Sequence, residues 1–372
     1  MPDDRIVCIL CPGGLEHSGG IGRAMGYLVD AWRREGTHGL HAVVLDTRGS
    51  GHIALSFVHL AWTLLVITIF AIRRRLRLVH INLSSHGSTL RKVIVMAVVS
   101  AIGAKAVLHL HGSRFESFFR ALPRFAQGVV RRMFMSADRV VVLGRHWRNF
   151  VIDEIGVPAR RVEIVFNGVP DPFVEPIPSA GTARANGRST HIVFLGRLSE
   201  RKGVPELLAA LDRLQHQNKE WHATLAGDGP VDNYRQEAMR RGLADRVKLP
   251  GWVDRDAADK LLRAADIIVL PSHQENQPMS VIEGMAYRVS VIATPVGALP
   301  DILSDGNNAL LVAPGDVEGL TNALGSLIDS PDLRSRIATA GRATFCKHLQ
   351  IHIAARQFAE IYDAVSPPRT HR

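Results

Sequence analysis

Cysteine is scarce in this sequence. Its 372 residues include three, Cys8, Cys11 and Cys346. Cys8 and Cys11 form a C-x-x-C pair, but no second Cys/His pair stands at the spacing of metal ligands. The scarcity argues against a structural zinc site, and we expect buried thiols in a reducing compartment.

Acidic residues are in deficit as well. The chain has 35 Asp and Glu against 45 Lys and Arg, which gives a net charge of +10. This excess favours anionic partners, namely phosphates, nucleic acid or an anionic membrane surface. The basic residues are dispersed and no nucleic-acid-binding module is recognisable, so we expect no nucleic-acid partner.

We do not expect the start of the sequence to be a secretory signal. Residues 1–5 are acidic, with two aspartates, and the apolar run that follows is short. We therefore expect a cytoplasmic protein, and peripheral attachment to the inner face of the plasma membrane stays open.

Long apolar runs are rare, and the one at residues 53–72 is followed by an arginine cluster. Its length suits a membrane span, but a span would separate the first two predicted strands from the rest of their sheet. We therefore predict a buried core helix with a basic end. Residues 114–134 interleave phenylalanine with arginine, which fits either docking on an anionic bilayer or a helix with one core face.

The remainder alternates short β-like runs with helical patterns, which is typical of βαβ units and parallel sheets. A stretch rich in proline, glycine and small residues at 171–190 predicts a linker between two α/β domains, 1–170 and 191–344, and a last helix is expected at about 345–365. The predicted strands are Ile6–Leu10, Ala42–Leu45, Val79–Leu83, Ala106–His111, Arg139–Leu143, Val162–Phe166, His191–Leu195, Ala223–Ala226, Val247–Leu249, Ile267–Leu270, Ser290–Ala293 and Ala309–Val312.

The strongest candidate site is the segment Pro271–Glu283. It follows an apolar strand, and ligands of such folds bind at the carboxyl edge of a parallel sheet. Pro278 opens a helix, whose first N–H groups favour a phosphate. A carboxylate on each side of that turn can accept hydrogen bonds from hydroxyl groups, so the segment suits a ligand with a diphosphate between two hydroxylated rings. The alternative is a capped surface helix without a ligand. The candidate ligand-binding residues of this segment are Glu275, Met279, Ser280 and Glu283.

Two further loops of the second half reach the same edge. Gly196 permits a close turn, and Arg197 and Lys202 can neutralise a diphosphate as it leaves, although a basic surface loop would look the same. The turn after the next strand and a later strand exit can each border a nucleotide base, but both are primarily turn chemistry. Their candidate residues are Gly227, Asp228, Gly229 and Val253.

The first half offers a glycine-rich loop and a histidine. Gly19, Gly20 and Ile21 precede a predicted helix, where backbone N–H groups can approach a phosphate. His111 ends a predicted strand and is followed by Gly112-Ser113. A histidine at that edge can contact a reacting group, although a lone histidine is more often structural.

Two other patterns have better structural explanations. Asp254-Arg255-Asp256 has the form of a metal-binding D-x-D, but it precedes a predicted helix and is expected to cap it. Gly20, Gly22 and Gly26 mimic a dinucleotide-binding fingerprint, but they start too far beyond the strand and their spacing is wrong. We expect neither a metal nor a nicotinamide cofactor.

Together these motifs resemble the retaining glycosyltransferases of family 4, which have the GT-B fold of two facing Rossmann-like domains with parallel sheets and an interdomain cleft. The resemblance covers nearly the whole chain. Its markers are the Gly19-Gly20 loop, His111-Gly112-Ser113, Asn167-Gly168-Val169, Gly196-Arg197, Lys202-Gly203, Gly227-Asp228-Gly229-Pro230, Glu275 with Glu283, and Thr294-Pro295-Val296-Gly297. The chain departs from the family at Asn276, Gln277, Pro278, Tyr287, Arg288 and Ala298, which affects the expected sugar and acceptor.

The resemblance implies an N-terminal acceptor domain, a C-terminal donor domain and a last helix that crosses back onto the first domain. It also implies that no metal is required. It assigns the donor diphosphate to Arg197 and Lys202, the donor sugar to Glu275 and His111, the ribose to Glu283, and phosphate-binding N–H groups to Gly20.

The implied reaction moves a sugar from a UDP- or GDP-sugar to a saccharide or lipid-linked saccharide in polysaccharide or glycolipid assembly, with retention at the anomeric carbon. No pair of carboxylates flanking a scissile bond can be assigned, which disfavours a hydrolase. Two alternatives stay open. One is a GT-B-fold nucleotide-sugar epimerase, and the other is a catalytically inactive binding protein attached to a membrane complex.

Overall fold

The structure, a computed structural model, describes residues 5–15, 19–35, 40–49, 55–173, 189–217 and 219–368. The chain divides into two compact units, which we call the first unit (Met1–Pro170 with Gln350–Arg372) and the second unit (Asp171–Leu349). Each contains a six-stranded parallel sheet with helices, which confirms the predicted α/β fold class. Most of the predicted linker lies outside the described residues.

The sheet of the first unit has the strand order β2-β1-β3-β4-β5-β6, and all its neighbours pair in parallel. The order reverses between β1 and β3, because β2 adds on one side of β1 and the later strands add on the other. Ligands of open α/β sheets bind at the carboxyl ends of the strands beside such a reversal. The strands are β1 (Ile6–Cys11), β2 (His41–Asp46), β3 (Leu76–Leu83), β4 (Ala106–Leu110), β5 (Arg139–Val142) and β6 (Val162–Ile164).

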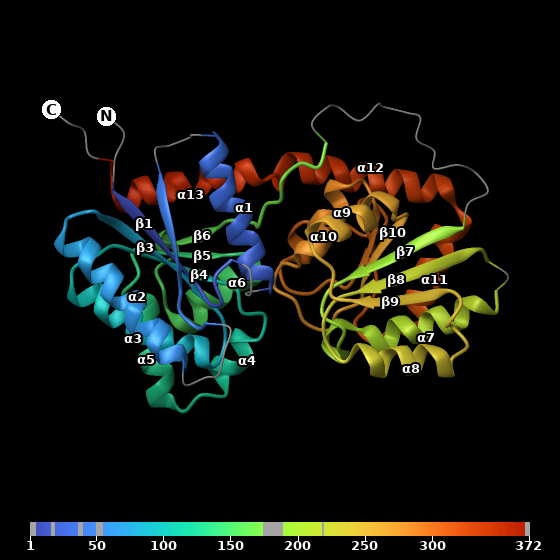
Figure 1. The fold of residues 1–372 in the computed structure, drawn as a ribbon, viewed down its shortest axis with the longest axis horizontal. Helices are drawn as coiled ribbons and strands as arrows, with labels where there is room; N and C mark the ends of the chain where they lie inside the picture. The colour runs from blue at the N-terminus through green and yellow to red at the C-terminus, as the bar shows by residue number, and fades with distance from the viewer. Residues whose placement is uncertain are drawn as a thin grey trace. The chain divides into compact units, whose positions relative to one another are not determined.

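Helices cover this sheet in two groups. Helix α13 packs against α1, where the indole Nε1 of Trp32 donates a hydrogen bond to the Ala355 carbonyl over 3.1 Å. Helix α3 contacts both α2 and α5 (Figure 1). The helices are α1 (Gly19–Glu35), α2 (Leu55–Ile72), α3 (Gly87–Ala101), α4 (Phe115–Arg120), α5 (Arg124–Met135), α6 (Arg145–Phe150) and α13 (Ile351–Val365), with short turns η2 (Val151–Ile155) and η3 (Ala159–Arg161).

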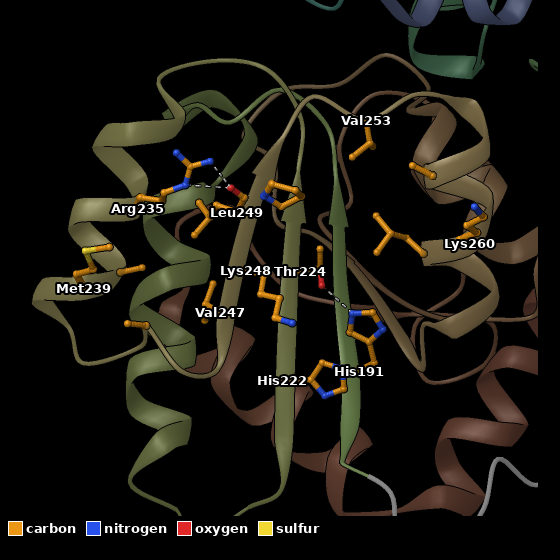
Figure 2. A pocket seen from close by; sticks show the side chains of 15 residues that line it. His191, His222, Thr224, Arg235, Met239, Val247, Lys248, Leu249, Val253 and Lys260 are labelled. Carbon is orange, nitrogen blue, oxygen red and sulfur yellow. Dashed lines mark hydrogen bonds between the residues drawn. The ribbon is translucent and has the colours of Figure 1, made fainter.

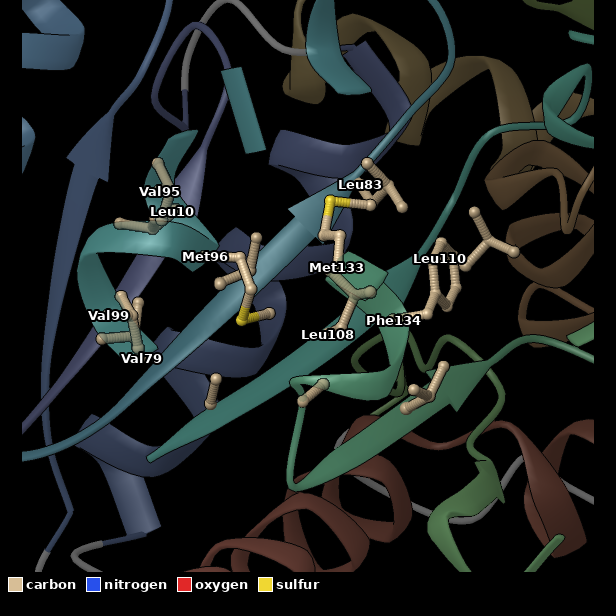
Figure 3. Close-up of a cluster of buried hydrophobic side chains, with 14 of the residues drawn as sticks. Leu10, Val79, Leu83, Val95, Met96, Val99, Leu108, Leu110, Met133 and Phe134 are labelled. Carbon is tan, nitrogen blue, oxygen red and sulfur yellow. The ribbon is translucent and has the colours of Figure 1, made fainter. Parts of the chain in front are cut away.

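The core of the first unit lies between the sheet and helices α3 and α5 (Figure 3). The strands are almost continuously apolar because helices bury both of their faces. The side chains that meet there include Leu10, Val79, Leu83, Leu108 and Leu110 from strands, Val95, Met96 and Val99 from α3, and Met133 and Phe134 from α5.

Helix α2 corrects the prediction of a buried core helix at 53–72. Only one side of it is buried, at the helical spacing of Ser56, Leu60, Thr63 and Ile67. The opposite side is apolar and exposed, because the whole helix is hydrophobic and only one side can face the sheet. That exposed side consists of Phe57, Val58, Trp62, Leu65, Ile69 and Ile72.

Residues 114–134 form two helices, α4 and α5, rather than one amphipathic helix. Phe115 and Phe119 are buried in the core, which favours the interpretation of a helix with a core face. Phe125 is the exception, with 77% of its surface exposed.

The sheet of the second unit has the order β12-β11-β10-β7-β8-β9, and its order reverses between β7 and β10. Its strands are β7 (Thr190–Leu195), β8 (Trp221–Ala226), β9 (Val247–Gly251), β10 (Ile267–Leu270), β11 (Ser290–Ala293) and β12 (Leu310–Leu311). Its helices are α7 (Val204–Gln215), α8 (Val231–Arg240), α9 (Arg255–Ala264), α10 (Met279–Ala286), α11 (Val317–Asp329) and α12 (Pro331–His348), with short turns η4 (Glu200–Lys202) and η5 (Leu299–Asp301).

Two smaller predictions are corrected in this part of the chain. The helix expected at about 345–365 is the end of α12 followed by α13, with a break at Leu349 and Gln350. Cys8 and Cys11 are buried in β1 as expected, but Cys346 on α12 is exposed.

Candidate active site

The loops at the carboxyl edge of the second sheet contact one another through their backbones. The loop after β7 bonds to the loop after β8, where Leu198 N donates to the Asp228 carbonyl over 2.7 Å. A Cβ on Gly227 would lie 1.8 Å from the Gly196 carbonyl oxygen, and one on Gly203 would lie 2.0 Å from that of Pro271. These glycines therefore allow loops from three strands to meet beside the reversal of strand order.

Lys202 and Glu275 form an ion pair at this reversal. Lys202 Nζ lies 2.5 Å from Glu275 Oε1, and the two side chains are 13% and 8% exposed. Arg201 lies 4.0 Å from the same oxygen and donates to the Gln274 carbonyl. Among the described residues, Oε1 has no aligned hydrogen bond despite the close charge. Oε1 is thus enclosed, and the cations beside it hold the carboxylate by charge.

Arg197 and Asp228 form a second pair, of different character. Their closest atoms are 2.7 Å apart, and the side chains are 60% and 54% exposed. An exposed pair of this kind is worth about 0–1 kcal/mol. Arg197 can therefore exchange its partner for a phosphate at little cost.

Helix α10 follows these loops and is buried throughout. Pro278 is its N-cap rather than its first residue, and no side chain caps this end. The N–H groups of the first turn, at Met279 and Ser280, have no partner within the helix and can bind a phosphate. Glu283 lies one turn further along and is 4% exposed.

The first sheet presents a different edge. Gly19, Gly20 and Ile21 form the first turn of α1. A Cβ on Gly20 would meet no atom of the described residues within 4 Å, so a ligand can approach the backbone there.

His111 follows β4 and is buried beside two other histidines. Its Nε2 lies 2.8 Å from Asn82 Oδ1, and its ring centroid lies 3.9 Å from that of His109. His109 is hydrogen-bonded to His80, which contacts the Tyr362 hydroxyl. Burial lowers the pKa of His111 to about 3, so the imidazole is neutral at physiological pH.

The predicted site residues thus fall into two sets. The second unit gathers its predicted residues on loops and a helix start at the carboxyl edge of its sheet, and the first unit gathers the remainder at its own edge. The set of the second unit is Gly196, Arg197, Lys202, Gly227, Asp228, Gly229, Val253, Glu275, Met279, Ser280 and Glu283, and that of the first is Gly19, Gly20, Ile21 and His111.

A groove of about 790 Å³ lies elsewhere in the second unit, over β7–β9 and between α8 and α9 (Figure 2). Of the predicted residues only Val253 lines it. The ion pairs and the start of α10 do not, so we do not place the reaction in this groove. His191, His222 and Lys248 lie along its floor.

Asp254 behaves as the sequence predicts. Its side chain accepts a hydrogen bond from Ala257 N over 2.8 Å and so caps α9. Within the part of the chain that the structure describes, no group of three His, Cys, Asp or Glu side chains could hold a metal ion.

Two residues of these edges were not predicted from the sequence. Arg201 forms an ion pair with Glu275, but the sequence alone does not distinguish it from its neighbour Lys202. Asn82 holds His111, and the only signal for it was an amide inside an apolar strand.

Comparisons with known proteins agree with this architecture. The family model for Glycosyl transferases group 1 matches residues 189–330, and that for Glycosyltransferase Family 4 matches residues 18–171. The chain is 30% identical over 300 residues to 2-deoxystreptamine N-acetyl-D-glucosaminyltransferase of Streptomyces fradiae, and the matched region covers 75% of this chain and 70% of that protein. It is 28% identical over 280 residues to phosphatidyl-myo-inositol mannosyltransferase of Mycobacterium leprae. That match covers 70% of this chain and 74% of the mannosyltransferase.

A solved structure extends the likeness to the whole chain. HepE from Anabaena, in complex with UDP, matches with a TM-score of 0.74 at 19% identity and covers 97% of this chain and 100% of HepE. The chain belongs to the glycosyltransferases of group 1 and family 4, which have the GT-B fold.

Proposed function

We propose that this protein transfers a sugar from a UDP- or GDP-sugar to an acceptor hydroxyl, with retention at the anomeric carbon and without a metal. One observation carries the proposal. The ion pair of Lys202 with the buried Glu275 lies at the reversal of strand order. It shares a loop with Arg197 and lies on the loop that leads to the uncapped start of α10. This combination suits a sugar on one side and a diphosphate on the other.

The second unit supplies the electrostatic part of the mechanism. The bond between the anomeric carbon and the phosphate oxygen breaks, and the acceptor oxygen forms the new bond to that carbon. Arg197, Lys202 and the first N–H groups of α10 stabilise the charge that develops on the departing diphosphate. A phosphate oxygen takes the acceptor proton, so no separate base is needed.

Glu275 and His111 bind hydroxyl groups of the donor sugar in this mechanism, and Glu283 binds the ribose. A carboxylate is a strong acceptor for a hydroxyl group. The UDP in the HepE structure supports a nucleotide-diphosphate donor. The name of the Streptomyces fradiae relative supports the transfer of a sugar.

We further propose a lipid-linked or membrane-presented acceptor. The exposed side of α2 carries large apolar side chains, with Phe57 60%, Trp62 62% and Ile72 76% exposed. The exposed arginines 73–75 follow it directly. Apolar side chains with adjacent arginines match the surface of an anionic bilayer. No helix in the described part of the chain is long and apolar enough to cross a membrane.

The test is a turnover assay with a panel of UDP- and GDP-sugars, with and without lipid-linked saccharides. We expect one donor to be consumed faster when a suitable acceptor is present. The anomeric configuration of the transferred sugar in the product should be the same as in the donor. Conversion of a donor without any acceptor would instead identify an epimerase. Binding of a donor without turnover of any donor would instead identify a catalytically inactive binding protein.

A further inference from the structure

Asn82 lies at the carboxyl end of β3, next to the strand that leads to His111. It is fully buried, and its amide bonds to Leu10 and to His111 and also contacts His80. Nδ2 donates to the Leu10 carbonyl on β1 over 3.2 Å, and Oδ1 lies 2.8 Å from His111 Nε2. A backbone carbonyl can only accept, so this bond fixes which end of the amide faces β1.

The orientation of the amide sets the tautomer of His111. Oδ1 can only accept a hydrogen bond, so the proton of the neutral imidazole must sit on Nε2. Nδ1 is then an unprotonated acceptor. It has no hydrogen-bond partner among the described residues, yet it is not one of the fully enclosed polar atoms, so it is open to a ligand.

We propose that Asn82 is a positioning residue that fixes His111 in the Nε2–H tautomer, so that Nδ1 accepts a hydrogen bond from a hydroxyl group of the donor sugar. The inference rests on the proposed function for the identity of the ligand, but not for the tautomer. A site built around such an acceptor discriminates against a deoxy sugar. Without the hydroxyl group of the sugar, Nδ1 of His111 has no hydrogen bond in the complex.

The surroundings of His111 keep this acceptor unprotonated. His109 from β4 and His80 from β3 are the nearest titratable groups, and Tyr362 from α13 closes the chain of contacts behind them. None of these groups is an acid that would stabilise an imidazolium. Burial, followed by the charge of a protonated His111, lowers the pKa of both other histidines.

The first experiment reads the tautomer directly in the full-length protein. Histidine-specific ¹⁵N labelling with two-bond ¹H–¹⁵N spectra distinguishes the two neutral forms, and His111→Gln identifies the His111 signals by their loss. We expect a neutral ring protonated at Nε2 throughout the range of about pH 8 to pH 5, which lies above its lowered pKa. An Nδ1–H tautomer, or a charged ring in this range, would overturn the inference.

The second experiment changes the partner of Nε2. Asn82→Asp replaces the whole amide with a carboxylate, so the hydrogen bond from Nδ2 to the Leu10 carbonyl is lost as well. The negative charge favours an imidazolium and raises the pKa of His111 by about 1–3 units. Nδ1 then becomes a donor, so we expect turnover of the donor to fall at low pH along the same titration that the ¹⁵N spectra follow. Asn149→Asp makes the same change at an exposed residue of α6 and should keep the wild-type profile.

The outcomes separate the inference from the proposed function. Identical pH profiles of the two variants, despite a raised pKa in Asn82→Asp, would show that Nδ1 does not bind the substrate. A wild-type protein that turns over no nucleotide sugar would refute the proposed function, whereas its tautomer would still report on Asn82.

Discussion

The carboxyl edges of the two sheets differ in how they keep polar groups buried. In the second unit, the buried carboxylate of Glu275 lies 2.5 Å from the largely covered ammonium group of Lys202. In the first unit, three histidines are buried with an amide and a phenol, and burial keeps His111 neutral. The attraction between paired charges offsets part of the free-energy cost of their desolvation. A buried imidazole without an opposite charge becomes neutral by losing its proton instead. One edge thus suits a charged diphosphate and the other suits hydroxyl groups.

The largest effect is expected from breaking the charged pair. Lys202→Met leaves Glu275 buried without its closest cation, so we expect a loss of about 3 kcal/mol in the free energy of unfolding, measured by urea denaturation. Adding Glu275→Gln should recover most of this loss. Lys219→Met is the control, because the partner of Lys219, Asp329, is 58% exposed. Equal losses in Lys202→Met and Lys219→Met would show that the buried pair has no special role.

Arg197→Ala tests the exposed charge at the same edge. We expect kcat/KM to fall by an amount that corresponds to roughly 2–4 kcal/mol of lost transition-state stabilisation, because the guanidinium would stabilise the departing diphosphate. The melting temperature should hardly change, since the pair with Asp228 is exposed. Arg240→Ala removes a surface arginine on α8 that is paired with Glu237 and should keep wild-type kinetics. Unchanged kinetics in Arg197→Ala would remove this residue from the site.

Glu275→Gln separates sugar binding from nucleotide binding. The amide keeps the size of the side chain but is a weaker acceptor for a hydroxyl group, so we expect transfer to slow by about 2 kcal/mol. Binding of UDP or GDP alone, measured by calorimetry, should change much less. Equal losses in transfer and in nucleotide binding would contradict a contact between Glu275 and the sugar.

The histidines of the first unit predict a dependence of stability on pH. Burial lowers the pKa of His80 and of His111 to about 3, against about 6.5 in an unfolded chain. Between these values only the unfolded chain binds the protons, so the free energy of unfolding falls as the pH drops below about 6.5, by up to about 1.4 kcal/mol per pH unit for each group. Above that value these groups have no effect.

Urea unfolding between about pH 7.5 and pH 5.5 measures this slope above the range in which most carboxylates titrate. His109→Leu removes one member of the cluster and should flatten the slope. A wild-type stability that does not change over this range would show that the imidazoles are not buried in the neutral form.

The smallest effect on stability is expected on α2. Trp62→Ser changes an exposed side chain and should shift the free energy of unfolding by no more than about 0.5 kcal/mol. Co-sedimentation with vesicles that contain anionic lipid should nevertheless decrease. Trp252→Ser is the matched control, because Trp252 is 73% exposed in the second unit. Equal retention by both variants would rule out α2 as the contact.

The sequence predicted the fold well, because each buried strand is a short apolar run between turn residues. All twelve predicted strands occur, within a few residues of their expected ends. The exposure of α2 was missed for a physical reason. A helix that is apolar on every side carries no periodic signal for the side that faces the sheet, so only packing reveals it.

For the candidate site, the sequence predicted positions on loops but not the partners of each side chain. Arg197, Lys202, Glu275 and His111 lie after strands in the structure, as expected from the sequence. The pairing of Lys202 with Glu275 joins loops after different strands, and its geometry depends on the order β7 next to β10. Asn82 was missed for the same reason, since its partner lies on a neighbouring strand.

We propose that the charged edge of the second unit binds the diphosphate of a nucleotide sugar. Thermal unfolding of the wild type and of Arg197→Ala, each with UDP- and GDP-sugars, measures this binding. We predict that at least one donor stabilises the wild type, by about 2.7 kcal/mol at 100 times its Kd, and that the same concentration stabilises Arg197→Ala far less. No stabilisation by any donor, or equal stabilisation of both proteins, would show that Arg197 and its edge do not bind the diphosphate.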